Sequence, residues 1–126
     1  MKNLYTSSTT NYLYAIRSIT KELGYCRAVD ISKKTGITPW STSTALKLMI
    51  KKGMIELDKN KIISLTMKSE LDLNRFDDNK IKLTKMFEQY TPDDELIERN
   101  VNEIFFLLDQ CLIDFIVSKK KRFFSK

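Results

Sequence analysis

Histidine is absent from the 126 residues, and glycine, proline and cysteine are scarce, with three, two and two residues respectively. Without histidine the chain has neither the Ser-His-Asp nor the Cys-His arrangement of nucleophilic catalysis, and it lacks the commonest side-chain ligand of metals. No nucleophile-base pair, phosphate-cradling glycine loop or ligand cluster takes their place. We therefore expect that the protein is no enzyme and uses no cofactor.

Long apolar runs and paired cysteines are missing as well. No run of about 18 apolar residues exists, and the first ten residues hold no apolar stretch typical of a signal peptide. Cys26 and Cys111 lie 85 residues apart and form no CxxC pair, which is typical of a reducing compartment. We expect a cytoplasmic protein that does not use a membrane, with both cysteines buried and structural rather than redox-active or metal-binding.

The net charge of +6 is distributed unevenly along the chain. Residues 1–66 carry 11 basic and 4 acidic side chains, residues 67–118 carry 6 and 12, and the last eight residues add five basic ones. A basic half favours a polyanion as partner, and an acidic half favours contact with protein. Plain surface solvation explains the net charge equally well, so charge alone decides nothing.

The positions of the glycines and the spacing of apolar residues predict the elements of the first half. Helices are expected at 11–23, 28–35 and 39–52, and Gly24, Gly36 and Gly53 follow their ends. Beyond Gly53 the apolar period changes to two, which predicts a β-hairpin with strands around 55–57 and 63–65 and a basic tip between them. This is the order of a winged helix-turn-helix.

The second half contains no glycine, and its apolar spacing is helical throughout. It predicts a long helix over 68–90 with a break near Asp77-Asp78, a helix that starts at 91–94, and a last helix over 111–120. The expected fold class is therefore mainly α with a small β-hairpin. We expect a winged helix-turn-helix domain over residues 1–66 and a helical dimerisation domain over 67–126, ending in a basic tail.

The third helix of a winged helix-turn-helix enters the major groove, and its early residues reach base edges. Hydroxyl groups there can bond bases or phosphates, and lysines further along the helix and at the hairpin tip can neutralise phosphates. The candidate DNA-binding residues are Trp40, Ser41, Thr42, Ser43, Thr44, Lys47, Lys51, Lys59 and Lys61. The alternative for the run of hydroxyl residues is that it is a generic helix start. The alternatives for Trp40 are that it packs on the hairpin or covers the core.

One family shares this order together with a set of residues. The residues that fit its pattern are Gly24-Tyr25, Arg27, Asp30-Ile31, Pro39, Lys52-Gly53 and Leu65-Thr66. In these the chain resembles the diphtheria toxin repressor and manganese transport regulator family of metalloregulators, in its short, two-domain form. The resemblance implies a DNA-binding repressor whose C-terminal helices form the interface of a homodimer.

The same resemblance implies a divalent metal held by carboxylates and histidines between the two domains. The positions that correspond to these ligands hold Asn11, Tyr14, Lys80, Asn102, Phe105 and Phe106. None is a carboxylate or an imidazole, so we expect no metal. The ammonium of Lys80 would stand where the ion should lie and partly replace it; the alternative is that these are ordinary core and surface residues.

Two functions are compatible with this sequence. The leading hypothesis is a homodimeric transcriptional regulator, a repressor, that binds a palindromic operator in double-stranded DNA without metal. The alternative is a winged-helix module that binds another protein, as an antirepressor or assembly factor does. Salt-dependent binding to duplex DNA distinguishes the two.

Overall fold

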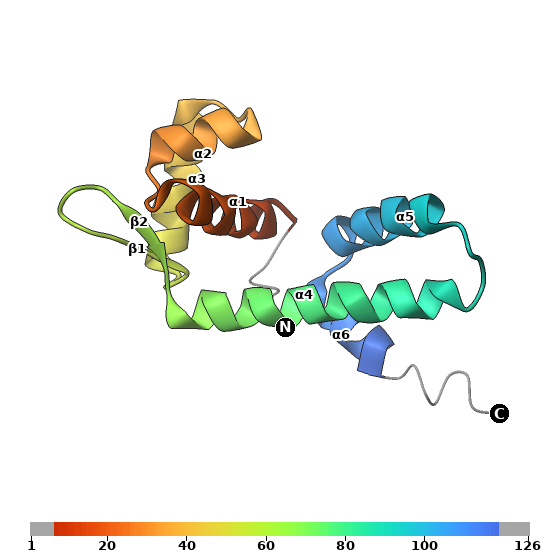
Figure 1. Cartoon of the computed structure of the whole chain (residues 1–126). Coiled ribbons are helices and arrows are strands. Elements are labelled where there is room, and N and C mark those ends of the chain that lie inside the picture. The colour runs from red at the N-terminus through yellow and green to blue at the C-terminus, as the bar shows by residue number, and fades with distance from the viewer. Residues whose placement is uncertain (1–6, 119–126) are drawn as a thin grey trace. The chain divides into compact units, whose positions relative to one another are not determined.

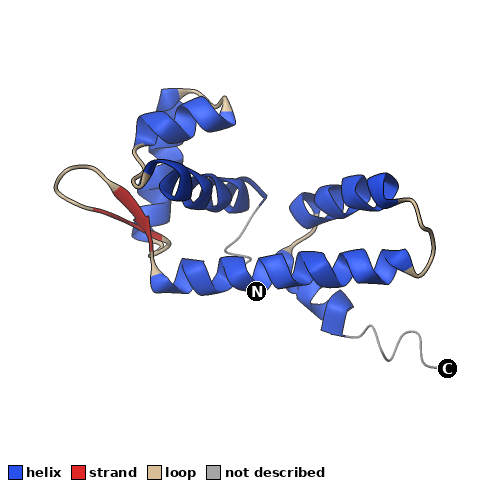
Figure 2. Ribbon diagram, in the orientation of Figure 1, coloured by secondary structure: helices blue, strands red, loops and turns tan. Residues whose placement is uncertain are grey.

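The protein is described by a computed structural model of residues 7–118, apart from the side chains of Ser7 and Phe106. The expected basic tail over 119–126 lies outside the described residues. The elements are α1 (Ser7–Leu23), α2 (Ala28–Thr35), α3 (Pro39–Lys51), β1 (Ile55–Leu57), β2 (Ile63–Leu65), α4 (Met67–Glu88), α5 (Asp94–Leu107) and α6 (Gln110–Ser118) (Figure 1). The chain is thus mainly helical with one antiparallel hairpin, which confirms the expected fold class (Figure 2).

The chain divides into two compact units, and the division falls inside α4. The first unit comprises Thr9–Leu73, and the second comprises the residues from Asn74 onward. Each unit has its own buried side chains. In the described residues, no helix is both long enough and apolar enough to pass through a membrane.

The core of the first unit is built from one face of each helix and the inner face of the hairpin. Its buried apolar side chains include Tyr12, Leu13, Ile16, Ile19, Ile31, Leu46, Met49, Met54, Ile55 and Ile63. The first helix begins at Ser7 rather than at Asn11 as expected. Thr10 lies within the helix and is buried to 1% exposure, which places it in the core.

The turn between α2 and α3 is fixed by local interactions that the sequence predicts. Gly36 has φ 74°, in the left-handed region that favours glycine, and its N–H donates to the carbonyl of Ser32 over 3.0 Å. The hydroxyl of Thr38 then accepts the N–H of Ser41 at 3.2 Å, and Pro39 is the first residue of α3. These contacts set where the third helix begins.

The hairpin pairs Ile55 with Leu65 and Leu57 with Ile63. At its tip the Asp58 carboxylate accepts two backbone N–H groups, from Asn60 at 2.8 Å and from Ile62 at 2.9 Å. The tip is therefore held by a side chain that satisfies the turn's own backbone donors, a role for which Asp is well suited. The backbone N–H of Ile63 donates to the Cys26 carbonyl over 2.8 Å and joins the hairpin to the segment before α2.

The second unit packs α4 against α5 and α6. The rings of Phe76 and Phe105 meet edge to face with centroids 6.3 Å apart, and both side chains are buried. Nδ2 of the buried Asn79 donates to Asp114 over 2.6 Å, which connects α4 to α6. The expected break at Asp77-Asp78 is wrong: α4 is continuous there.

Two further features define the helices of this unit. Asp78 forms an ion pair with Lys82 one turn later, at 3.0 Å, so the acidic pair supports the helix of which it is part. The helix α5 has Asp93 as its N-cap, whose carboxylate accepts the N–H of Leu96 at 3.0 Å.

Candidate nucleic-acid interface

The third helix presents most of its predicted DNA-binding residues to solvent. Six of them belong to this helix and are exposed: Trp40, Ser41, Ser43, Thr44, Lys47 and Lys51. Trp40 is 78% exposed, so it neither packs on the hairpin nor covers the core. Thr44 donates its hydroxyl hydrogen to the Trp40 carbonyl over 3.0 Å, and its oxygen is then free only to accept.

Thr42 differs from its neighbours because it lies on the opposite side of the helix. It is 0% exposed and shares the buried face of α3 with Leu46 and Met49. A side chain inside the core makes no contact at the surface of the unit. We therefore leave Thr42 out of the interface that the other residues form.

A groove of about 480 Å³ lies between α3, the start of α2 and the hairpin. Ser43 and Lys47 line it from the helix, and Lys61 lines it from the hairpin tip. The structure thus brings three of the predicted residues to one surface feature. Lys51 and Lys59 are exposed as well but lie outside the groove lining.

Two further polar residues of this groove were not among the predicted ones. Arg27 lines it from the turn before α2, and Asn60 lines it from the hairpin tip. Arg27 is exposed, and its guanidinium carbon lies 5.8 Å from the centroid of the Tyr25 ring. Arg27 is one of the residues that fit the family pattern, so the sequence does single it out. Helix periodicity, however, does not predict that it lies beside α3.

The two cysteines occupy different environments. Cys26 is buried, and desolvation by that burial, with a smaller contribution from the negative charge of Asp30, raises the pKa of its thiol to about 11. A thiol so held is a poor nucleophile and a poor metal ligand at neutral pH. Cys111 is exposed, so the expectation that both cysteines are buried is wrong for this one.

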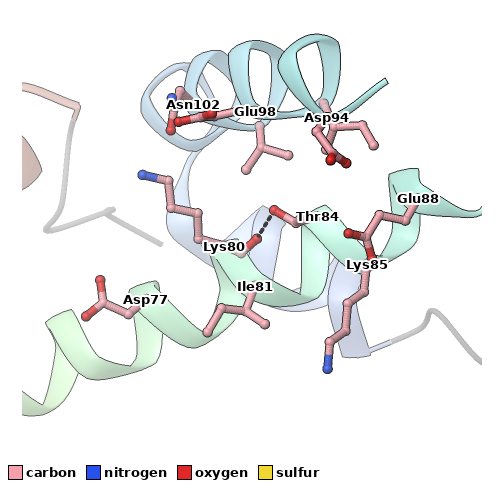
Figure 3. A pocket seen from close by; sticks show the side chains of 11 residues that line it. Asp77, Lys80, Ile81, Thr84, Lys85, Glu88, Asp94, Glu98 and Asn102 are labelled. Carbon is pink, nitrogen blue, oxygen red and sulfur yellow. Dashed lines mark hydrogen bonds between the residues drawn. The ribbon is translucent and has the colours of Figure 1, made fainter. Parts of the chain in front are cut away.

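The second unit contains a wider groove of about 690 Å³ between α4 and α5. Figure 3 shows Lys80 and Asn102 toward one end of it and Glu88 and Asp94 toward the other. The Thr84 hydroxyl donates to the Lys80 carbonyl over 2.9 Å. Lys80 Nζ lies 5.3 Å from the centroid of the Phe105 ring, close enough for a cation–π interaction.

The residues at the six family ligand positions do not fit a divalent metal. Lys80 brings a positive charge, Phe105 is a buried phenyl ring, and Asn102 is a half-buried neutral amide. In the first unit Asn11 is exposed, and Tyr14 is half-buried with the Arg17 guanidinium carbon 4.9 Å from its ring centroid. The carboxylate and imidazole donors that the resemblance implies stand at none of these positions.

Phe106, at the sixth position, has its side chain outside the described part of the structure. Within that part, no three acidic or cysteine side chains gather closely enough to hold a metal ion.

Comparisons with known proteins give a fold and no sequence relative. No protein-family model and no curated protein matches the sequence. The fold is similar to that of a hypothetical protein from Sulfolobus solfataricus, at 15% identity and a TM-score of 0.75, over 94% of this chain and 88% of that one. It is also similar to IdeR of T. acidophilum, at 17% identity and a TM-score of 0.64, over 98% of this chain and 55% of IdeR.

The present chain thus spans about half the length of IdeR. IdeR belongs to the diphtheria toxin repressor family, so the fold implied by the resemblance in sequence is confirmed. At these identities the similarity establishes the fold alone. The function of this chain depends on the residues that it carries on that fold.

The burial of Cys26 generates a prediction about its reactivity. In a Cys111→Ser protein, iodoacetamide at about pH 8 should modify Cys26 about a hundredfold more slowly in the native than in the unfolded state, because the raised pKa leaves little thiolate. Mass spectrometry of the alkylated protein measures both rates. Rapid stoichiometric labelling of the native protein would contradict the burial and reopen a redox role for Cys26.

Proposed function

We propose that the protein is a sequence-specific DNA-binding transcriptional regulator, a repressor, that acts as a homodimer without metal and without catalytic activity. The observation that carries the proposal is the exposed, basic and hydroxyl-rich side of α3, whose Lys47 shares a groove with Lys61 of the hairpin tip. This surface belongs to a fold similar to that of IdeR. The first half of the chain is also the basic half.

The proposed way in which α3 docks on duplex DNA follows from the side chains on its outer side. Residues Ser41, Ser43 and Thr44 lie near the beginning of α3, where a recognition helix meets base edges. Lysines at the hairpin tip and further along the helix have side chains long enough to reach phosphates on either side. In this arrangement α3 reads the major groove, and Lys59 and Lys61 contact the backbone beside it.

DNA binding is tested by removing the helix lysines. Lys47→Ala and Lys51→Ala should weaken binding to every duplex sequence and lower the salt slope by about 0.9 for each phosphate that is no longer neutralised. Fluorescence anisotropy at several salt concentrations measures both quantities. Lys85→Ala, which removes a lysine of the second unit, is the matched control and should bind as the parent does.

The contrary result is also informative. If the parent binds no duplex in a salt-dependent manner, the DNA-binding proposal fails. The winged-helix module that binds another protein then becomes the better explanation.

The homodimer is supported by apolar side chains that the second unit leaves exposed. Ile97, Val101 and Phe105 from the expected apolar stripe are buried inside the unit, so they are not available to a partner. Leu96, Leu107 and Leu112 are 38%, 79% and 46% exposed. A two-fold dimer would cover such leucines and present two copies of α3 to a palindromic operator.

Charge placed among these leucines should separate the protomers. Leu107→Asp and Leu112→Asp should shift the sedimentation coefficient from that of a dimer toward that of a monomer, because burying a carboxylate in an apolar interface is unfavourable. Leu71→Asp serves as the control, since Leu71 is 61% exposed in the first unit. A parent that sediments as a monomer at tens of micromolar would refute the dimer.

Metal independence is supported by the donors at the ligand positions. A metal selects a binding-competent state only through a difference in its affinity for the two states. An ammonium, amides, a phenol and phenyl rings offer a divalent ion almost no such difference. The cation of Lys80 over the Phe105 ring instead supplies a fixed positive charge within the second unit.

Affinity for duplex DNA should therefore be the same with a chelator and with saturating manganese. The two measurements are made at one ionic strength, so that counterion effects do not imitate a response. A tightening by manganese of tenfold, about 1.4 kcal/mol of coupling, would show that the chain holds a metal after all.

A further inference from the structure

The solvent-facing side of α3 carries an apolar stripe. Trp40, Thr44 and Leu48 are spaced four residues apart, which places them along one side of a helix. Trp40 is 78% and Leu48 is 52% exposed, and Thr44 lies between them. Large apolar side chains in this position contribute nothing to the core, which α3 contacts through its other side.

The surroundings of this stripe indicate what covers it. Lys47 and Lys51 lie beside Leu48 on the same helix, and Lys52 follows at its end. Acidic side chains are absent from α3. An apolar stripe set among cations fits a polyanion with an apolar surface feature, which double-stranded DNA offers in its major groove.

The sequence of α3 also lacks several of the side chains that read bases. It contains no arginine, asparagine, glutamine or acid, so hydrogen bonds from α3 to bases are confined to its lysines, its hydroxyl groups and the indole of Trp40. Lys47 is directed to the groove beside the hairpin, and the hydroxyl hydrogen of Thr44 is donated to the helix backbone. The indole N–H of Trp40 is therefore the one hydrogen-bond donor that the three residues of the stripe offer to a base.

One major-groove feature remains that apolar side chains can distinguish. Thymine carries a C5-methyl group, and apolar side chains recognise it by contact. We propose that Leu48 and Trp40 are specificity-determining residues that select thymine at fixed positions of the operator through its methyl group. This inference rests on the proposed DNA-binding function and assigns the base class that it recognises.

The experiment removes the methyl group and nothing else. The full-length protein is used to select a binding site from random duplex DNA, and each thymine of that site is then replaced in turn by deoxyuridine, which pairs with adenine but has no methyl. Parent affinity should fall about three- to fivefold at one or more positions in each half-site, as expected for one buried methyl. Leu48→Ala should abolish this difference at one position, and Trp40→Ala at another.

The matched control is Leu23→Ala, because Leu23 is an equally exposed leucine, at 49%, on α1 of the same unit. It should keep the full sensitivity of the parent to uracil. Circular dichroism of each variant verifies that the helices are intact.

Two failures can be told apart. If the parent binds duplex DNA with a normal salt dependence but binds thymine and uracil sites equally, this inference is overturned and the proposed function stands. Variants of Leu48 and Trp40 that both keep the parent's sensitivity to uracil would overturn it equally. Absence of any salt-dependent binding to duplex DNA would instead refute the proposed function, and this inference with it.

Discussion

Burial of one side of α3 is the constraint on which the rest of the first unit depends. Thr42, Leu46 and Met49 are spaced at helical intervals and pack into the core with at most 6% exposure. Because a helix has only one orientation that buries these three, every other side chain of α3 has its direction fixed. The outward direction of Ser41, Ser43 and Lys47 follows from that packing rather than from any property of their own.

The hairpin is tied to the same core by hydrogen bonds to the backbone. The buried Ser69 hydroxyl donates to the Met54 carbonyl over 2.7 Å, and the Thr66 N–H donates to the same carbonyl over 3.2 Å. On the other strand, the Ile63 N–H donates to the Cys26 carbonyl. These bonds anchor the chain just before β1 and at the first residue of β2. The basic tip between the two strands therefore projects from a fixed base. The groove lined by Lys47 and Lys61 is thus formed by two elements that are held independently, α3 by packing in the core and the hairpin by hydrogen bonds.

Much of this arrangement could be predicted because its signals are local. The bounds of α2, the left-handed Gly36, the Thr38 cap and the two strands each depend on residues within a few positions. The errors concern tertiary burial. Cys111 is expected to be buried, as unpaired cysteines usually are, yet in α6 the buried residues nearest to it are Gln110 and Ile113.

The hydroxyl of Thr42 favours a place in the interface, but its spacing to Leu46 and Met49 puts it on the buried side of the helix. The break in α4 was inferred from two adjacent acids, which an ion pair to Lys82 accommodates within a continuous helix.

The hydroxyl oxygen of Thr42 has no hydrogen-bond partner among the described residues. The Thr42 side chain therefore contributes to the core by filling volume, and the side chain of valine has nearly the same shape. Residues on this side of α3 are constrained by packing in the core, whereas those on the opposite side are exposed to solvent. Substitutions on the exposed side can therefore change the surface of the unit while the packing of its core stays intact.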